Sequence, residues 1–95
     1  MKIAVVCSLG MCHTVFTPKA LDDLRKLGDV VINEGEATVE NVKKTIKDAD
    51  IAVTSWGSPA MSKEILDECP NLKLVLHAAG SVKPIVTDEL WARGI

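Results

Sequence analysis

The segment that follows the apolar residues 74–76 carries the strongest chemical signal in the sequence. It reads His77-Ala78-Ala79-Gly80-Ser81-Val82-Lys83, so a run of small side chains is followed by one positive charge. Backbone N–H groups flanked by small side chains can approach a ligand closely, and successive free N–H groups form a nest for a carboxylate or a phosphate. An ordinary tight turn between a strand and a helix has the same composition, and the spacing alone favours that turn.

Cys7 is the second candidate for chemistry, because it ends an apolar run at residues 2–7. A cysteine at the end of a strand and above a helix N-terminus can have a lowered pKa and accept a phosphoryl group. Thr14 and the loop amides would then hold the phosphate. The segment 7–14 is similar to the phosphocysteine loop of the IIB components of sugar phosphotransferase transporters. A buried structural cysteine is the favoured interpretation, since the first helix is expected only after Thr17.

Short apolar runs alternate with amphipathic segments along the whole chain, which predicts the pattern βαβαβαβα. The predicted strands are residues 2–7, 30–32, 51–54 and 72–76. The predicted helices begin after the capping residues Thr17, Thr38, Ser62 and Thr87. Their apolar stripes predict a core of Ala20, Leu21, Leu24, Leu27, Val39, Val42, Ile46, Ala49, Ile65, Leu66, Cys69, Leu90 and Trp91.

This alternation predicts an α/β fold with a mainly parallel sheet, right-handed crossovers and helices on both faces. We expect a flavodoxin-like three-layer sandwich with the strand order 2-1-3-4, and Ile95 resembles the first residue of a fifth strand. A chain of 95 residues is enough for one domain, so a single domain over residues 1–95 is expected. Ligands of such sheets bind beyond the carboxyl ends of the strands, where the loops 8–16, 55–60 and 77–86 would meet.

Four segments in the second half of the chain resemble the N-terminal, substrate-binding domain of the D-isomer-specific 2-hydroxyacid dehydrogenase family. They are Asp50-Ile51-Ala52-Val53-Thr54-Ser55-Trp56-Gly57-Ser58-Pro59, Pro70-Asn71-Leu72-Lys73-Leu74-Val75, His77-Ala78-Ala79-Gly80-Ser81-Val82 and Arg93-Gly94-Ile95. Phe16, Thr17 and Pro18, with the leucines that follow them, resemble the start of that domain's first helix. The resemblance therefore spans most of the chain.

The resemblance implies that this chain binds a small 2-hydroxy or 2-oxo acid. In the family, backbone amides of the loop after the fourth strand hold the substrate carboxylate, and the loop after the third strand lines the same cleft. Together with the charge of Lys83, this predicts the substrate-binding residues Ser55, Trp56, Gly57, Ala79, Gly80, Ser81, Val82 and Lys83. The family commonly has a glycine-rich turn followed by Asp-Asn, whereas this sequence has Ser81-Val82-Lys83-Pro84, which leaves the individual acid undefined.

The resemblance also implies an NAD or NADP cofactor for the full-length family, but this chain is expected to bind none. The dinucleotide motif GxGxxG is missing, since the six glycines are at positions 10, 28, 35, 57, 80 and 94. The family's catalytic Arg, Glu and His have no matching positions here either. Because the protein must position the cofactor for hydride transfer, the chain alone is expected to be inactive as a dehydrogenase.

Charge and composition limit the other partners. The net charge is -2 with no basic block, so no nucleic-acid partner is predicted. The apolar run at residues 3–7 is too short for a signal peptide or a membrane span, which predicts a cytoplasmic protein. Three cysteines with no close pair predict neither a disulfide framework nor a metal site. A fourth strand at the sheet edge, protected only by Lys73, predicts a homodimer built on that edge or on the rim that faces the cleft.

Overall fold

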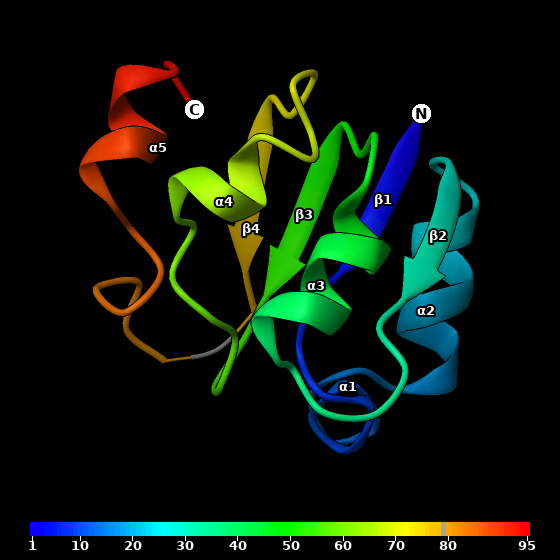
Figure 1. The fold of residues 1–95 in the computed structure, drawn as a ribbon. Helices are drawn as coiled ribbons and strands as arrows, with labels where there is room; N and C mark the ends of the chain where they lie inside the picture. The colour runs from blue at the N-terminus through cyan, green and yellow to red at the C-terminus, as the bar shows by residue number, and fades with distance from the viewer. Residues whose placement is uncertain (79) are drawn as a thin grey trace.

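The computed structural model describes residues 1–78 and 80–95, which form one parallel sheet with helices on both of its faces (Figure 1). In chain order the elements are β1 (Lys2–Val5), α1 (Leu9–Val15), α2 (Pro18–Arg25), β2 (Asp29–Ile32), α3 (Val39–Ile46), β3 (Ile51–Thr54), α4 (Lys63–Leu66), β4 (Leu74–His77) and α5 (Asp88–Ala92). The strand order is β2-β1-β3-β4, which confirms the predicted flavodoxin-like α/β arrangement.

The helix starts follow the predicted capping chemistry. The side chains of Thr17, Thr38 and Thr87 each accept a hydrogen bond from the backbone N–H three residues later, at 3.1, 3.2 and 3.1 Å. These bonds satisfy one of the N–H groups that a helix start leaves free. Ser62 precedes α4 as predicted, but its side chain makes no capping hydrogen bond.

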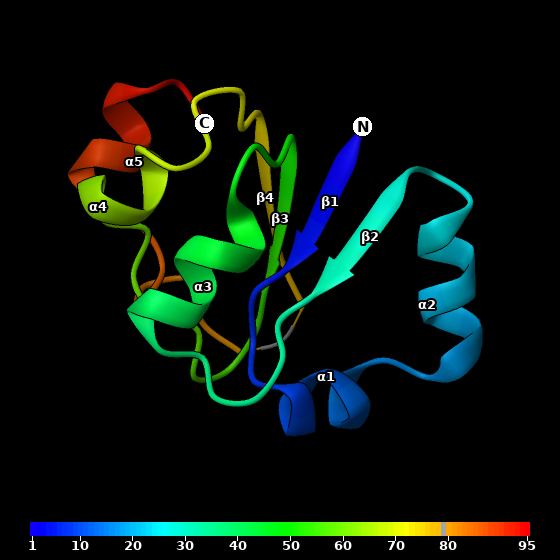
Figure 2. The same cartoon turned by 45° about the vertical axis from the view of Figure 1, so that its right-hand side comes forward.

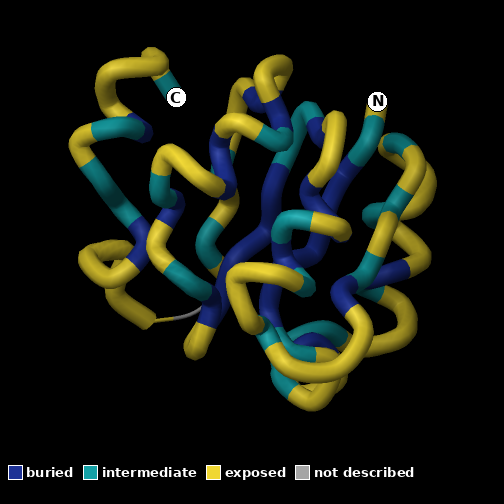
Figure 3. Tube along the Cα trace, in the orientation of Figure 1, coloured by how far each residue is buried: buried dark blue, intermediate teal, exposed yellow. Residues whose placement is uncertain are grey.

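The core consists of two layers, one on each face of the sheet (Figure 2). On one face α3, α4 and α5 pack over Ala4 and Ala52 of the central strands. On the other face α1 and α2 pack over Ile3 and Val5. The burial coloring follows this arrangement, since β1 and β3 form the buried center of the molecule (Figure 3). Among the described residues, none of the helices has the length and apolarity that crossing a membrane requires.

The segment between β1 and α2 differs from the expectation, because α1 forms where a long loop was predicted. Ser8 caps this helix, with its Oγ accepting from the N–H of Met11 at 3.2 Å. Cys12 is fully buried, and Phe16 packs against the same core layer. Gly10 and Thr14 are weak helix formers, so tertiary packing of Cys12 rather than local propensity stabilises this helix.

Three residues of the predicted core are exposed, and Val39 is the least exposed of them at 38%. Leu27 is 71% exposed, because α2 ends before it, at Arg25. Trp91 is 63% exposed, whereas its neighbour Leu90 is 4% exposed and faces the core. Successive helical residues point about 100° apart, so only one of two adjacent apolar residues in a short helix can face the sheet.

One face of the edge strand β4 is only partly covered. Leu74 and Leu76 are 44% and 45% exposed, while Val75 packs on the opposite face against the layer of α3, α4 and α5. Figure 2 shows no helix over β4 on the side where α2 lies, within the described part of the chain. The predicted edge position of the fourth strand is therefore confirmed, and its unpaired backbone groups are available to a partner.

We expect this edge to support a homodimer at micromolar concentration, because pairing would remove an unpaired apolar edge. A symmetric contact would need to bury roughly 1,000 Å² or more in total. Leu76→Lys should shift the chain to monomer in sedimentation, whereas Val31→Lys on the opposite edge strand, where Val31 is 39% exposed, should not. A wild-type chain that sediments as a monomer at all concentrations would contradict the prediction.

Candidate functional site

The loops that follow β3 and β4 meet at the carboxyl edge of the sheet. Thr54 lies opposite His77 in the parallel register, so the residues directly after these two strands are brought side by side. A cavity of about 240 Å³ lies between the loops. Its lining residues are Ser55, Trp56, Gly57, Ser58, His77, Ser81, Pro84 and Ile85. The structure therefore brings together four of the predicted binding residues, which are Ser55, Trp56, Gly57 and Ser81.

The remaining predicted residues have different positions. Gly80 does not line the cavity but contacts Trp56, since a Cβ built on Gly80 would lie 2.2 Å from the indole Nε1. Val82 and Lys83 are exposed and are not part of the cavity lining. Ala79 lies outside the described residues. The charge of Lys83, which was expected at the site, is thus placed on the outer surface of the loop.

Ser58 fixes the loop after β3 to the center of the sheet, and the sequence analysis did not identify it. Its Oγ accepts from the N–H of Ser55 at 3.1 Å and donates to the carbonyl of Val6 at 3.0 Å. The N–H of Ser58 in turn donates to the carbonyl of Ser55 at 3.1 Å. These three bonds hold Ser55 in a rigid turn, so the cavity wall is preorganised.

His77 is the second residue that sequence reasoning left without a role. Its Nδ1 lies 2.8 Å from Oγ1 of Thr54, a residue that is fully buried. The other ring nitrogen, Nε2, is buried and has no hydrogen-bond partner within residues 1–78 and 80–95. The same holds for Oγ of Ser55. The sequence placed His77 at the end of a strand, but only the tertiary structure shows that it lies beside Thr54 and that its second nitrogen is unpaired among the described residues.

Unpaired buried polar atoms are rare in native proteins, because each destabilises the fold by about 1–3 kcal/mol. Here both atoms belong to residues that line the same cavity. The cavity lining therefore contains an imidazole nitrogen and a hydroxyl whose hydrogen-bonding capacity is unused within the described residues. The walls contributed by Trp56, Pro84 and Ile85 are largely apolar, so a ligand would be shielded from water on those sides.

Trp56 also lines a second hollow at the rim. That hollow has a volume of about 300 Å³, and it shares Trp56 and Gly57 with the first. It lies beside the caps of α1 and α3, Ser8 and Thr38. Because Trp56 is 55% exposed and lines both spaces, its fluorescence should report on a ligand in either one.

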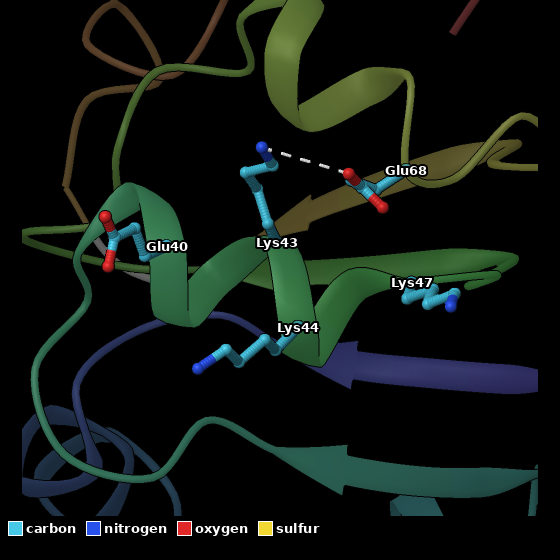
Figure 4. A pocket seen from close by; sticks show the side chains of 5 residues that line it. All are labelled: Glu40, Lys43, Lys44, Lys47 and Glu68. Carbon is cyan, nitrogen blue, oxygen red and sulfur yellow. Dashed lines mark ion pairs between the residues drawn. The ribbon is translucent and has the colours of Figure 1, made fainter.

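A larger hollow of about 370 Å³ lies on the outer surface of α3, and it has the character of a solvated helix face (Figure 4). It is lined by Glu40, Lys43, Lys44, Lys47 and Glu68. The ammonium of Lys43 is paired with carboxylates of α4 and the segment after it, at 3.2 Å from Glu64 and 3.9 Å from Glu68. Mixed and partly paired charges of this kind are typical of an exposed helix.

The surroundings of Cys7 disfavour a phosphoryl acceptor. The first helix, α1, begins at Leu9 with Ser8 as its cap, so the long distance that was expected between Cys7 and the first helix does not exist. However, Cys7 is fully buried, and burial, reinforced by the nearby Cys12, raises the pKa of its thiol to about 11. Nucleophilic cysteines have lowered pKa values instead. The hydroxyl of Thr14 donates to the carbonyl of Gly10 inside the helix, so it does not face the helix start.

We therefore expect no phosphate on Cys7 when the chain is incubated with phosphoenolpyruvate and the general phosphotransferase components. The measurement is intact-mass spectrometry of the wild type, of Cys7→Ser and of Cys69→Ser. Cys69 is the matched control, because burial raises the pKa of its thiol to about 11 as well. A phosphate that appears on the wild type and on Cys69→Ser but not on Cys7→Ser would establish the carrier function.

Within the described part of the chain, no three His, Cys, Asp or Glu side chains gather into a group that could hold a metal ion. Comparison of the sequence with models of protein families finds no match, and comparison with curated proteins finds none either. The proposed function therefore rests on the residues that line the cavity beyond β3 and β4.

Proposed function

We propose that this domain binds a small 2-hydroxy or 2-oxo acid in the cavity beyond β3 and β4. One observation carries the proposal. Ser55, Trp56 and Gly57 were predicted from one loop and Ser81 from another, more than twenty positions away, and all four line the same cavity. A volume of about 240 Å³ lies below the usual range for drug-sized ligands, which suits an acid of a few carbon atoms.

The second loop offers backbone donors for the carboxylate. Within the described residues, neither the N–H of Ser81 nor that of Val82 donates a hydrogen bond. The N–H of Lys83 is occupied, since it donates to Oγ of Ser81 at 3.2 Å. Of these two amides, that of Ser81 belongs to a residue that lines the cavity, and a backbone N–H of this kind can bind an anion, which supports the carboxylate site expected from the sequence.

The chain's residues do not fit the nicotinamide dinucleotide that the resembled family uses. A dinucleotide pyrophosphate needs a glycine-rich turn between the first strand and the helix that follows it. Here the turn between β1 and α1, residues 6–8, contains no glycine. The proposed role is therefore substrate binding, and hydride transfer would need a cofactor site supplied by another part of a protein or another chain.

The proposal is tested by titrating the chain with glyoxylate, pyruvate, glycolate and lactate. We expect saturable binding at millimolar or lower concentration, seen as a shift of the indole N–H resonance of Trp56 in a Trp91→Phe background. Lactamide is the matched control ligand, because it has the shape of lactate but no carboxylate. If none of the acids shifts the Trp56 signal, or if lactamide binds as tightly as lactate, the proposed function is wrong.

A further inference from the structure

We infer that Thr87 is a positioning residue for the cavity beyond β3 and β4. It ties one wall of this cavity to α5, so that the wall and the helix open and close as one unit. The inference rests on the proposed function, since it concerns the cavity that would bind the acid. It gives Thr87, which was predicted only as a helix cap, a second role.

The wall in question consists of Pro84 and Ile85, which line the cavity and precede α5 in the chain. Ile85 is 3% exposed and also belongs to the core layer of α3, α4 and α5, so it contributes to both the core and the cavity. Its carbonyl accepts a hydrogen bond from the N–H of Met61 at 3.0 Å. This bond joins the Pro84–Ile85 wall to the segment that leads from β3 to α4.

Thr87 completes a hydrogen-bonded link between this wall and α5. Its hydroxyl donates to the carbonyl of Met61 at 2.6 Å, and its Oγ1 accepts from the N–H of Leu90 at 3.1 Å. Met61 is fully buried, and Thr87 is the only donor to its carbonyl among the described residues. Losing the Thr87 hydroxyl would therefore leave a buried carbonyl unpaired beside the bond that holds Ile85.

The helix α5 has only five residues, too few for a helix that is stable by itself, so it depends on its contacts with the rest of the domain. The guanidinium of Arg93 donates to the carbonyl of Leu66 at 3.1 Å and pairs with Asp67 at 2.6 Å. These contacts hold α5 beside α4 (Figure 1). Undocking of α5 would break the bond from Thr87 and release the Pro84–Ile85 wall, so the two movements are coupled.

The link is tested first without a ligand, by hydrogen exchange of the Met61 and Leu90 amides. Thr87→Val keeps the shape and removes the hydroxyl, so both amides should exchange about tenfold faster, and Thr87→Ser should restore both. A role in capping alone would affect Leu90 only. Thr17→Val is the matched control, because it removes the cap of α2, and Thr17 does not line the cavity. Exchange of Met61 that is no faster in Thr87→Val than in Thr17→Val would overturn the inference.

The second measurement connects the unit with the ligand. If the cavity exists only while α5 is docked, pyruvate at about ten times its dissociation constant should slow the exchange of Met61 and Leu90 about tenfold in the wild type. Binding itself is read independently, from the indole N–H resonance of Trp56. Thr87→Val should bind pyruvate about tenfold more weakly than the wild type, and Thr17→Val within about twofold of it.

The outcomes separate this inference from the proposed function. If pyruvate shifts the Trp56 resonance but leaves the exchange of both amides unchanged, the inference is wrong and the proposed function stands. If no acid shifts the Trp56 resonance, the proposed function is wrong, and the role of Thr87 in acid binding is wrong with it, even where the exchange without ligand shows the link to α5.

Discussion

Replacing Leu90 by Ala is expected to lower the free energy of unfolding by about 2–4 kcal/mol. Leu90 is 4% exposed and belongs to the core layer formed with α3 and α4. Truncation removes its transfer free energy and leaves a cavity in a domain too small to fill it by rearrangement. Since small domains are stable by only about 5–15 kcal/mol, the loss should be visible as a large shift of the urea midpoint.

Trp91 provides the control for Leu90, because it is the adjacent residue of α5 and much the larger side chain. At 63% exposure, Trp91→Ala should lower the free energy of unfolding by less than about 1 kcal/mol. Judged by side-chain size alone, the order of the two effects would be reversed. A larger loss for Trp91→Ala than for Leu90→Ala would show that α5 presents its other side to the sheet.

The second large effect is expected for Gly80→Ala, which should both destabilise the domain and weaken acid binding. The φ angle of Gly80 is +80°, a region that costs an alanine about 1–2 kcal/mol. In addition, the new Cβ would lie 2.2 Å from Nε1 of Trp56, so the indole must move. Because Trp56 lines the cavity, its displacement should change the tryptophan emission of the free protein and weaken pyruvate binding more than tenfold.

Gly35→Ala isolates the backbone contribution to this effect. Gly35 has a φ of +81°, and a Cβ built on it meets no heavy atom within 4 Å. The two variants should therefore share the loss of about 1–2 kcal/mol that arises from φ. Only Gly80→Ala should alter the emission of Trp56 and the affinity for the acid. Identical behaviour of the two variants would contradict the close contact between Gly80 and the indole.

The site owes its shape to the register of β3 and β4. Thr54 opposite His77 places a hydroxyl next to an imidazole and brings the two following loops together. The loop after β3 is held by Ser58, and the loop after β4 is held against Trp56 by the absence of a side chain at Gly80. Rigid strands thus place residues from distant parts of the chain within one small cavity, as in other parallel sheets whose ligands bind at the carboxyl edge.

The amino-acid sequence alone was sufficient to predict the α/β class, the four strands, their order and four of the helix starts. These features depend on local patterns, namely short apolar runs, amphipathic stripes and Thr or Ser caps, and on chirality rules that hold for any βαβ unit. The loops that form the site were also predictable, because the carboxyl ends of parallel strands always lie at one edge. The individual residues Ser55, Trp56, Gly57 and Ser81 were predicted from the resemblance to the substrate-binding domain of the 2-hydroxyacid dehydrogenases.

Only the tertiary structure decided the features that depend on which side chains meet across the fold. The helix α1 forms because Cys12 is buried against the sheet, although its local propensity is weak. Leu90 rather than Trp91 faces the core, since both are apolar and the rotation of α5 decides between them. The unpaired atoms of Ser55 and His77 depend on the full inventory of neighbours in space. Long-range contacts of this kind leave no periodic signal in one sequence, because the partners are separated by loops of arbitrary length.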